Sequence, residues 1–243
     1  MKSVKNTLLL PLLTVALLAP SAVRADETNH WHFDTSLNLF LAGLSGDVAM
    51  RGQPAHVGAS FGTIFDHLKG AAAGTVAAGY GRWSLATEFS YLELGATTAP
   101  ADVELKQWLV EPSLRYKFCD YMEGLAGARY NNLDGTINFH GPLGRVGGGT
   151  QEWWDPIVGA QLSFPLIGRK LTFDGRFDVG GFGVGSDLTW QVFPFLNWRF
   201  AQWASAQLGY RWLGTDYETG SGASRFRYDV VAQGPQIGVT FHF

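Results

Sequence analysis

Acidic and basic residues recur at every second position in several segments of this sequence. In residues 171–181, for example, Asp174, Arg176 and Asp178 alternate with apolar or small residues. Such period-two alternation puts the charged side chains on one face of a β-strand and the apolar ones on the other. Charges of both signs on one buried face must pair, because an isolated buried charge carries a large desolvation cost. The sequence therefore predicts a network of ion pairs.

The same alternation in other strand-like segments predicts nine inward-facing members of this network. They are Glu88, Glu111, Arg115, Glu123, Arg129, Asp174, Arg176, Asp178 and Arg211. Asp155 and Arg199 fall on the same inward faces. If the strands surround a narrow lumen, these residues form a salt-bridged polar plug that holds the strands together, since small barrels are filled by side chains. A narrow path for ions or small solutes is the alternative, because wide water-filled channels need more strands.

Hydrolysis needs a nucleophile or water activated by a neighbouring base, and two groups of residues qualify by type. These are Asp66 with His67, and His140 with Ser186 and Asp187. None lies in a motif specific for such activation, and adjacent residues point apart in an extended chain. We therefore expect that the protein is not an enzyme. A hydrolase at the outer rim is the third hypothesis, after the structural role and the channel.

Metal, cofactor and nucleic-acid partners are not expected. The six histidines are scattered except for His30 and His32, and the single cysteine, Cys119, excludes an intrachain disulfide and a cysteine-based metal cluster. The glycine-rich residues 180–187 suggest a phosphate loop by composition, but residues 188–200 alternate as a strand where that loop needs a helix. The formal net charge of −3 argues against a nucleic-acid partner.

Ten strand-like segments position these side chains. They span residues 32–42, 71–80, 83–94, 105–118, 121–132, 153–164, 171–181, 188–200, 203–213 and 228–243. Each is close to the roughly 9 to 11 residues that a tilted strand needs to cross a bilayer. Short turns alternate with longer connections, of which 43–70 and 133–152 are the longest, and residues 60–69 fit either a loop or a short helix.

This pattern predicts an all-β protein, an antiparallel transmembrane β-barrel of about ten strands, or of eight if the first two segments are not strands. Aromatic residues support a membrane location because they gather at both ends of the segments, where bilayer interfaces select them. At the short turns these are Tyr80, Trp83, Phe118, Tyr121, Phe164, Trp198, Phe200, Trp203 and Phe243, and near the long connections Trp154, Trp190, Trp212 and Tyr217.

The start of the chain reads as a secretory signal peptide. Lys2 and Lys5 precede an apolar stretch, residues 7–19, and small residues surround Arg24 just before Asp26. This order of basic, apolar and small residues predicts cleavage after residue 25. The expected domains are a signal peptide, residues 1–25, and a barrel, residues 26–243.

The last segment alternates apolar and small or polar residues and ends at Phe243. It resembles the closing strand of Gram-negative outer-membrane barrels, which implies recognition by the barrel-assembly machinery. The architecture resembles small barrels of the OmpA and OmpW type. The stretches IFDHLK, DPIVGAQL and DVGGFGVGSDLTWQ resemble a group of proteobacterial outer-membrane barrel proteins.

The resemblance implies a monomer in the cell outer membrane, in contact with lipid and lipopolysaccharide, with a structural or surface-interaction role. It brings no established chemistry to individual residues.

Overall fold

The computed structural model describes residues 30–50, 53–97, 101–139, 146–168 and 170–243. The predicted signal peptide, residues 1–25, lies outside the described residues. Within these ranges the chain forms strands and two short helices, with the following bounds. They are β1 (Trp31–Phe40), β2 (Gly43–Met50), β3 (Gln53–Ala59), α1 (Phe61–Asp66), β4 (Leu68–Tyr80), β5 (Trp83–Thr97), β6 (Ala101–Cys119), β7 (Met122–Phe139), β8 (Val146–Ile167), β9 (Leu171–Gly181), β10 (Leu188–Ala201), β11 (Ala204–Thr219), η1 (Gly222–Ser224) and β12 (Phe226–His242).

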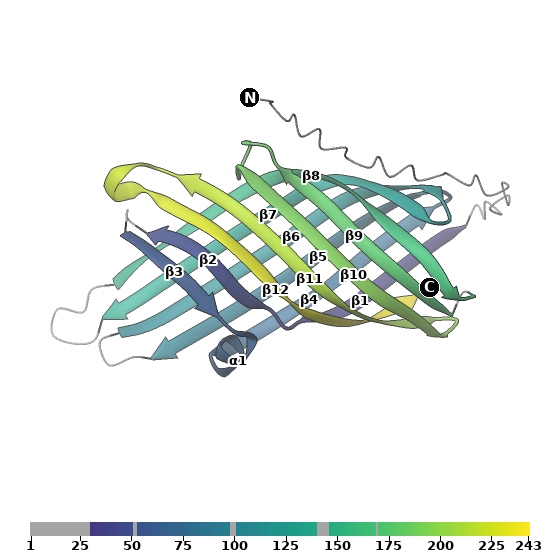
Figure 1. Cartoon of the computed structure of the whole chain (residues 1–243), viewed down its shortest axis with the longest axis horizontal. Coiled ribbons are helices and arrows are strands. Elements are labelled where there is room, and N and C mark those ends of the chain that lie inside the picture. The colour runs from purple at the N-terminus through teal and green to yellow at the C-terminus, as the bar shows by residue number, and fades with distance from the viewer. Residues whose placement is uncertain (1–29, 51–52, 98–100, 140–145, 169) are drawn as a thin grey trace, which may run out of the picture.

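Ten of these strands close an antiparallel barrel (Figure 1). Their order around the ring is β1-β4-β5-β6-β7-β8-β9-β10-β11-β12, and β12 pairs back onto β1 from Asp34 opposite His242 to Phe40 opposite Gln236. Closure leaves no sheet edge between β12 and β1, which a bilayer requires because it offers no water to free N–H and C=O groups. The prediction of ten strands is confirmed, and the count of eight is wrong.

The side chains alternate between the lipid face and the lumen as the sequence predicts. Leu37, Leu85 and Val158 are 68%, 59% and 49% exposed, whereas inward Ser113 is buried. Exposed aliphatic residues form the outer band, and aromatic residues such as Trp83 flank it at the short-turn end. An apolar outer band between aromatic girdles is the surface of a transmembrane barrel.

The prediction of a long polar loop over residues 133–152 is wrong. β7 and β8 continue through this region and stay paired from Leu133 opposite Gln151 to Asn138 opposite Val146. Gly148 and Gly149 lie within β8. Beyond the bilayer a strand needs no apolar face, so the alternation that marks the membrane-spanning part disappears although the strand continues.

The connection predicted over residues 43–70 contains regular structure. β2 and β3 form a hairpin, and α1 follows it before β4 begins at Leu68. Residues 60–69 thus include a helix, whose first turn is capped by Ser60: its side chain accepts a hydrogen bond from the Thr63 N–H. No helix in the described part of the chain is long and apolar enough to span a bilayer.

Tyr217 was predicted in the aromatic belt near the long connections, and this is wrong. Its side chain is buried in the barrel and stacks on Trp153, with 4.0 Å between ring centroids and 7° between ring planes. Phe226 completes the cluster, and Leu133 and Tyr228 pack against it. Aromatic residues therefore fill the lumen at the end of the barrel that carries the long connections.

The lipid face predicts a depth-dependent effect of charge along β8. Val158 lies about midway between outward Trp154 and outward Phe164, near the two interfaces. Val158→Arg should destabilise the folded barrel by about 2–4 kcal/mol, and Phe164→Arg by about 0–1 kcal/mol. Urea unfolding in lipid vesicles measures both, and equal costs at the two positions would contradict the placement of the membrane band.

Candidate functional site in the lumen

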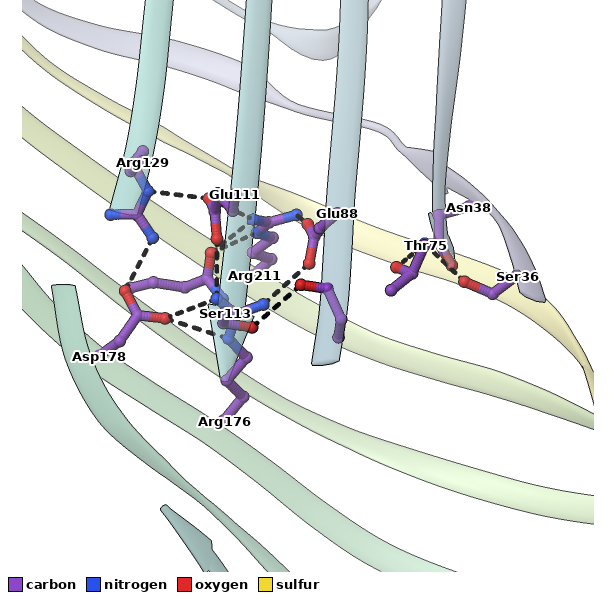
Figure 2. A network of polar contacts seen from close by, with 12 residues as sticks. Ser36, Asn38, Thr75, Glu88, Glu111, Ser113, Arg129, Arg176, Asp178 and Arg211 are labelled. Carbon is purple, nitrogen blue, oxygen red and sulfur yellow. Dashed lines mark hydrogen bonds and ion pairs between the residues drawn. The ribbon is translucent and has the colours of Figure 1, made fainter. Parts of the chain in front are cut away.

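A network of buried ion pairs lies in the lumen (Figure 2). On β7, Arg129 Nε donates to Glu111 Oε1 at 2.8 Å, and Arg129 Nη2 donates to Asp178 Oδ1 at 2.7 Å. Both partners come from other strands, Glu111 from β6 and Asp178 from β9. One guanidinium thus joins three strands of the wall.

Two further arginines extend this network. Arg176 donates to Glu88 Oε2 at 2.8 Å, to Glu111 Oε2 at 2.7 Å and to Asp178 Oδ2 at 3.1 Å. Arg211 on β11 donates to Glu88 Oε1 at 2.5 Å and lies 3.7 Å from Glu111 Oε1. The lumen network therefore consists of Glu88, Glu111, Arg129, Arg176, Asp178 and Arg211, three positive and three negative charges.

The network joins opposite walls of the barrel. In the ring of ten strands, β6 and β11 are five strands apart in either direction, so they lie diametrically opposite. Yet Arg211 Nη2 on β11 is only 3.7 Å from Glu111 Oε1 on β6. Side chains from opposite walls meet in the middle, so they occupy the cross-section at this height.

Uncharged lumen residues satisfy the remaining donors of these arginines. Arg129 Nη1 donates to Thr189 Oγ1 at 2.6 Å, while Arg211 donates to the side-chain oxygens of Gln191 and, at 3.3 Å, Gln236. Glu111 and Arg129 are 1% and 0% exposed. Buried charges are tolerated only with such complete pairing.

The other predicted members lie outside the lumen network. Asp174 is buried and accepts from Thr172 Oγ1 at 2.7 Å, while Arg115 and Glu123 form a separate pair at 3.7 Å. Asp155 is buried on β8, where its Oδ1 accepts from the Ser186 N–H at 2.6 Å. Arg199 is exposed near the short turn after β10, so it also lies outside the lumen network.

Two cavities lie on either side of the lumen network. The lower cavity is the one on the short-turn side of the network. It has a volume of about 310 Å³, is polar and reaches Glu88 and Arg176 of the network. The upper cavity, of about 200 Å³, is mainly apolar and lined by residues such as Leu109 and Leu213. Asn38 borders both cavities and bonds to Ser36 at 3.2 Å and to Gln207 at 2.9 Å, beside the lumen network (Figure 2).

Among the described rim residues considered for hydrolysis, no hydrogen bond joins a histidine to a serine or to a carboxylate. His67 bonds through Nδ1 to the Thr63 carbonyl at 2.7 Å, at the end of α1. Ser186 is buried and its Oγ has no hydrogen-bond partner among the described residues. His140 lies outside the described residues. In the described ranges, no group of three or more His, Cys, Asp or Glu side chains is placed to hold a metal.

A serine, histidine and aspartate that the sequence did not single out meet at the short-turn end of the lumen. Ser205 Oγ lies 3.1 Å from His242 Nε2, and His242 Nδ1 lies 2.6 Å from Asp34 Oδ1. The three residues come from β11, β12 and β1, and all line the lower cavity. Asp34 and His242 are 208 positions apart, so only the pairing of β12 with β1 could have indicated this relay.

The glycine-rich residues 180–187 form a tight turn between β9 and β10. Gly181 and Gly183 have φ of 87° and 73°, in the left-handed region that favours glycine. β10 begins at Leu188, directly after the turn. Because a strand follows the turn, as the sequence predicts, there is no helix N-terminus to face a phosphate.

Comparisons with known proteins were made on sequence and on structure. No protein-family model and no curated protein matches the sequence. The fold is similar to the outer membrane protease OmpT of Escherichia coli, with 8% identity over 89% of this chain and 98% of that one and a TM-score of 0.49. It is also similar to the Yersinia pestis attachment invasion locus protein Ail, solved with the heparin analogue sucrose octasulfate, with 12% identity over 88% and 98% and a TM-score of 0.37.

A third similar structure is the translocator domain of the autotransporter NalP from Neisseria meningitidis, with 12% identity over 87% of each chain and a TM-score of 0.40. At these identities the similarity concerns fold and not activity. An even-numbered, closed antiparallel barrel with an apolar outer band is the architecture of bacterial outer-membrane proteins. This chain is an outer-membrane β-barrel.

The lumen network predicts a large cost for removing one charge. Glu111→Leu leaves Arg129 and Arg176 without their shared partner in a buried site and should destabilise the barrel by about 3–5 kcal/mol. The matched control is Glu218→Leu, which breaks the exposed pair with Arg225, where Glu218 Oε1 and Oε2 accept at 2.8 and 2.9 Å. Exposed pairs contribute little because water screens them, so the control should unfold like the wild type in urea. A Glu111 variant as stable as this control would contradict the network's structural role.

Proposed function

We propose that this outer-membrane barrel has a structural or surface-interaction role and a lumen closed to bulk solutes by its ion network. The observation that carries the proposal is the contact between opposite walls, Arg211 with Glu111, within a network that includes Glu88 and Arg176. A path through the barrel would have to break several buried ion pairs at once, each held at low dielectric.

A narrow channel is the alternative, and the same residues argue against it. Channels of this barrel class conduct when the strand number leaves an aqueous lumen, whereas small barrels are filled by side chains. Here the lumen network carries equal numbers of positive and negative charges, so no excess charge favours one sign of ion. We therefore expect function to reside in the lipid-facing and loop surfaces.

The expected partners follow from the surfaces. We expect the outer band to contact lipid, and the ends of the strands beyond the belt near the long connections to contact lipopolysaccharide. Phe243 is 76% exposed at the short-turn end, where its backbone pairs with Phe33. An exposed aromatic end of the closing strand fits recognition by the barrel-assembly machinery. We expect a monomer.

Conductance tests the closed lumen. The barrel refolded into a planar bilayer should show no discrete openings, with the heat-dependent gel shift as the control for folding. The double variant Glu88→Ala, Arg211→Ala removes a matched pair that reaches across the lumen and should create measurable openings. The double variant Glu218→Ala, Arg225→Ala, outside the lumen network, should stay silent. Reproducible openings of the wild-type barrel would reject the proposal.

A second candidate function, hydrolysis of an ester or similar acyl compound, is favoured by the relay of Ser205, His242 and Asp34. In this function His242 Nε2 takes the proton of Ser205 Oγ as the oxygen attacks the carbonyl carbon, and Asp34 holds the protonated ring through Nδ1–H. Ser205 is 3% exposed but lines the lower cavity. As a structural element, the same relay would only tie β11, β12 and β1 together.

A fluorophosphonate probe separates these two roles because it reacts with serines activated by a base. If the relay is catalytic, Ser205 should be labelled, labelling should vanish in Ser205→Ala, and His242→Ala should slow it by about a hundredfold or more. Ser186→Ala is the matched control, since the Ser186 Oγ has no hydrogen-bond partner among the described residues. A folded barrel that resists labelling would leave the relay a structural bridge.

A further inference from the structure

The barrel wall is interrupted between β3 and β4. β12 pairs with β1 along one half of its length and with β2 along the other, in one continuous register from Asp34 opposite His242 to Ala49 opposite Arg227. The edge of β1 that faces away from β12 pairs with β4 only as far as Leu37 opposite Gly74. The corresponding edge of β2 pairs with β3 and not with β4. Among the described strands, none pairs with the free edge of residues 68–73. We call this interruption the lateral gap.

α1 is placed in the lateral gap by the chain itself, because it connects β3 to β4 (Figure 1). Ile64 is buried, whereas Phe61 and Phe65 are exposed and their ring centroids lie 5.7 Å apart. All three line the upper cavity together with Leu68 of β4. The helix therefore borders an opening and does not seal it as a paired strand would.

The upper cavity extends from the lateral gap into the barrel. Its lining includes Leu39 and Leu68 at the wall and Leu109, Leu213 and Val230 inside. None of the described residues that line it is charged. At about 200 Å³ it is smaller than the roughly 300–1,000 Å³ of pockets for drug-sized ligands, which favours a single chain over a ring system.

The inner end of the upper cavity contains an unused hydrogen-bond donor. Asn131 is 2% exposed, and its Nδ2 has no partner among the described residues. Gln107, Thr215 and Tyr228 line the same cavity. Buried donors are normally paired because leaving one unpaired costs free energy, so Asn131 points to a ligand atom that accepts a hydrogen bond.

The lateral gap lies at the height of one bilayer interface. Ala72, on the unpaired part of β4, is opposite Tyr91, and Tyr91 is opposite Trp108. The rings of Tyr91 and Trp108 lie 4.6 Å apart in the belt near the long connections. Because aromatic belts mark the interfaces, the gap opens toward the leaflet on the long-connection side. This is the outer leaflet, since outer-membrane barrels have short periplasmic turns and longer extracellular connections.

We propose that the lateral gap and upper cavity bind a single-chain amphiphile with a neutral head, such as a monoacylglycerol, taken from the outer leaflet. The head enters first and its carbonyl or hydroxyl oxygen accepts from Asn131 Nδ2, while the acyl chain lies between Leu39, Leu68 and the phenylalanines of α1. A neutral head is required because the described lining offers no counter-charge for a buried carboxylate or phosphate. This site lies above the lumen network and does not depend on whether the lumen conducts.

A monoacylglycerol with a diazirine in its acyl chain tests the proposal in vesicles containing the refolded barrel. Irradiation should label residues of α1 and the start of β4, located by peptide mass spectrometry. Ala73→Phe, opposite Ser90 on the cavity lining, should reduce labelling at least about tenfold by filling the space. Ala78→Phe is the matched control on the same strand, β4. Ala78 lies opposite the exposed Leu85 of β5 and faces lipid, so this variant should be labelled as strongly as the wild type. The gel shift verifies folding of each variant.

Asn131→Leu tests the head group separately. It should weaken monoacylglycerol binding about tenfold, the worth of one hydrogen bond, and leave binding of a diazirine-labelled alkane unchanged. Equal labelling in Ala73→Phe and wild type would overturn the site. Loss of labelling in Ala73→Phe with no effect of Asn131→Leu would overturn the assignment of the head group and leave a hydrocarbon site.

Discussion

The pairing of buried charge in the lumen is the constraint on which the rest of the barrel depends. Three arginines and three carboxylates are removed from water here, and each is tolerated only while its partners on other strands stay in place. Glu111 contacts Arg129, Arg176 and Arg211, from three different strands. A slip of one residue in strand register would turn these side chains toward lipid. The network therefore fixes register, and in the proposed function it also closes the lumen.

The sequence predicted the membrane-spanning part well because a bilayer imposes a strict pattern. Alternation identified all ten barrel strands, and the bounds of β9 agree with the prediction to the residue. Where the wall leaves the bilayer, as in β7 and β8 beyond Leu133, one face need no longer be apolar and the pattern disappears. Tyr217 was misplaced for a related reason, since an aromatic residue near a strand end fits both an interface and an inner cluster.

The inward charges of the candidate site were predictable, but not which of them meet. Alternation gives the face of each residue, whereas contact across the lumen also requires equal height, which depends on the tilt and stagger of the strands. Arg115 and Glu123 face inward yet form their own pair, away from Glu111. The relay of Ser205, His242 and Asp34 was missed for the same reason, because it exists only once β12 closes onto β1.

A lumen closed by the network is physically compatible with the lateral gap in the wall. β12 keeps one register along β1 and β2, so the gap occurs on the opposite edge, where β2 pairs with β3 and leaves the first residues of β4 unpaired. Beneath this opening the lumen network blocks the way to the lower cavity. An amphiphile in the upper cavity meets the lumen network beyond it, and crossing the network would separate ion pairs with nothing to replace their partners. An amphiphile entering through the gap should therefore leave by the same route, which favours binding at the membrane surface over passage through the barrel.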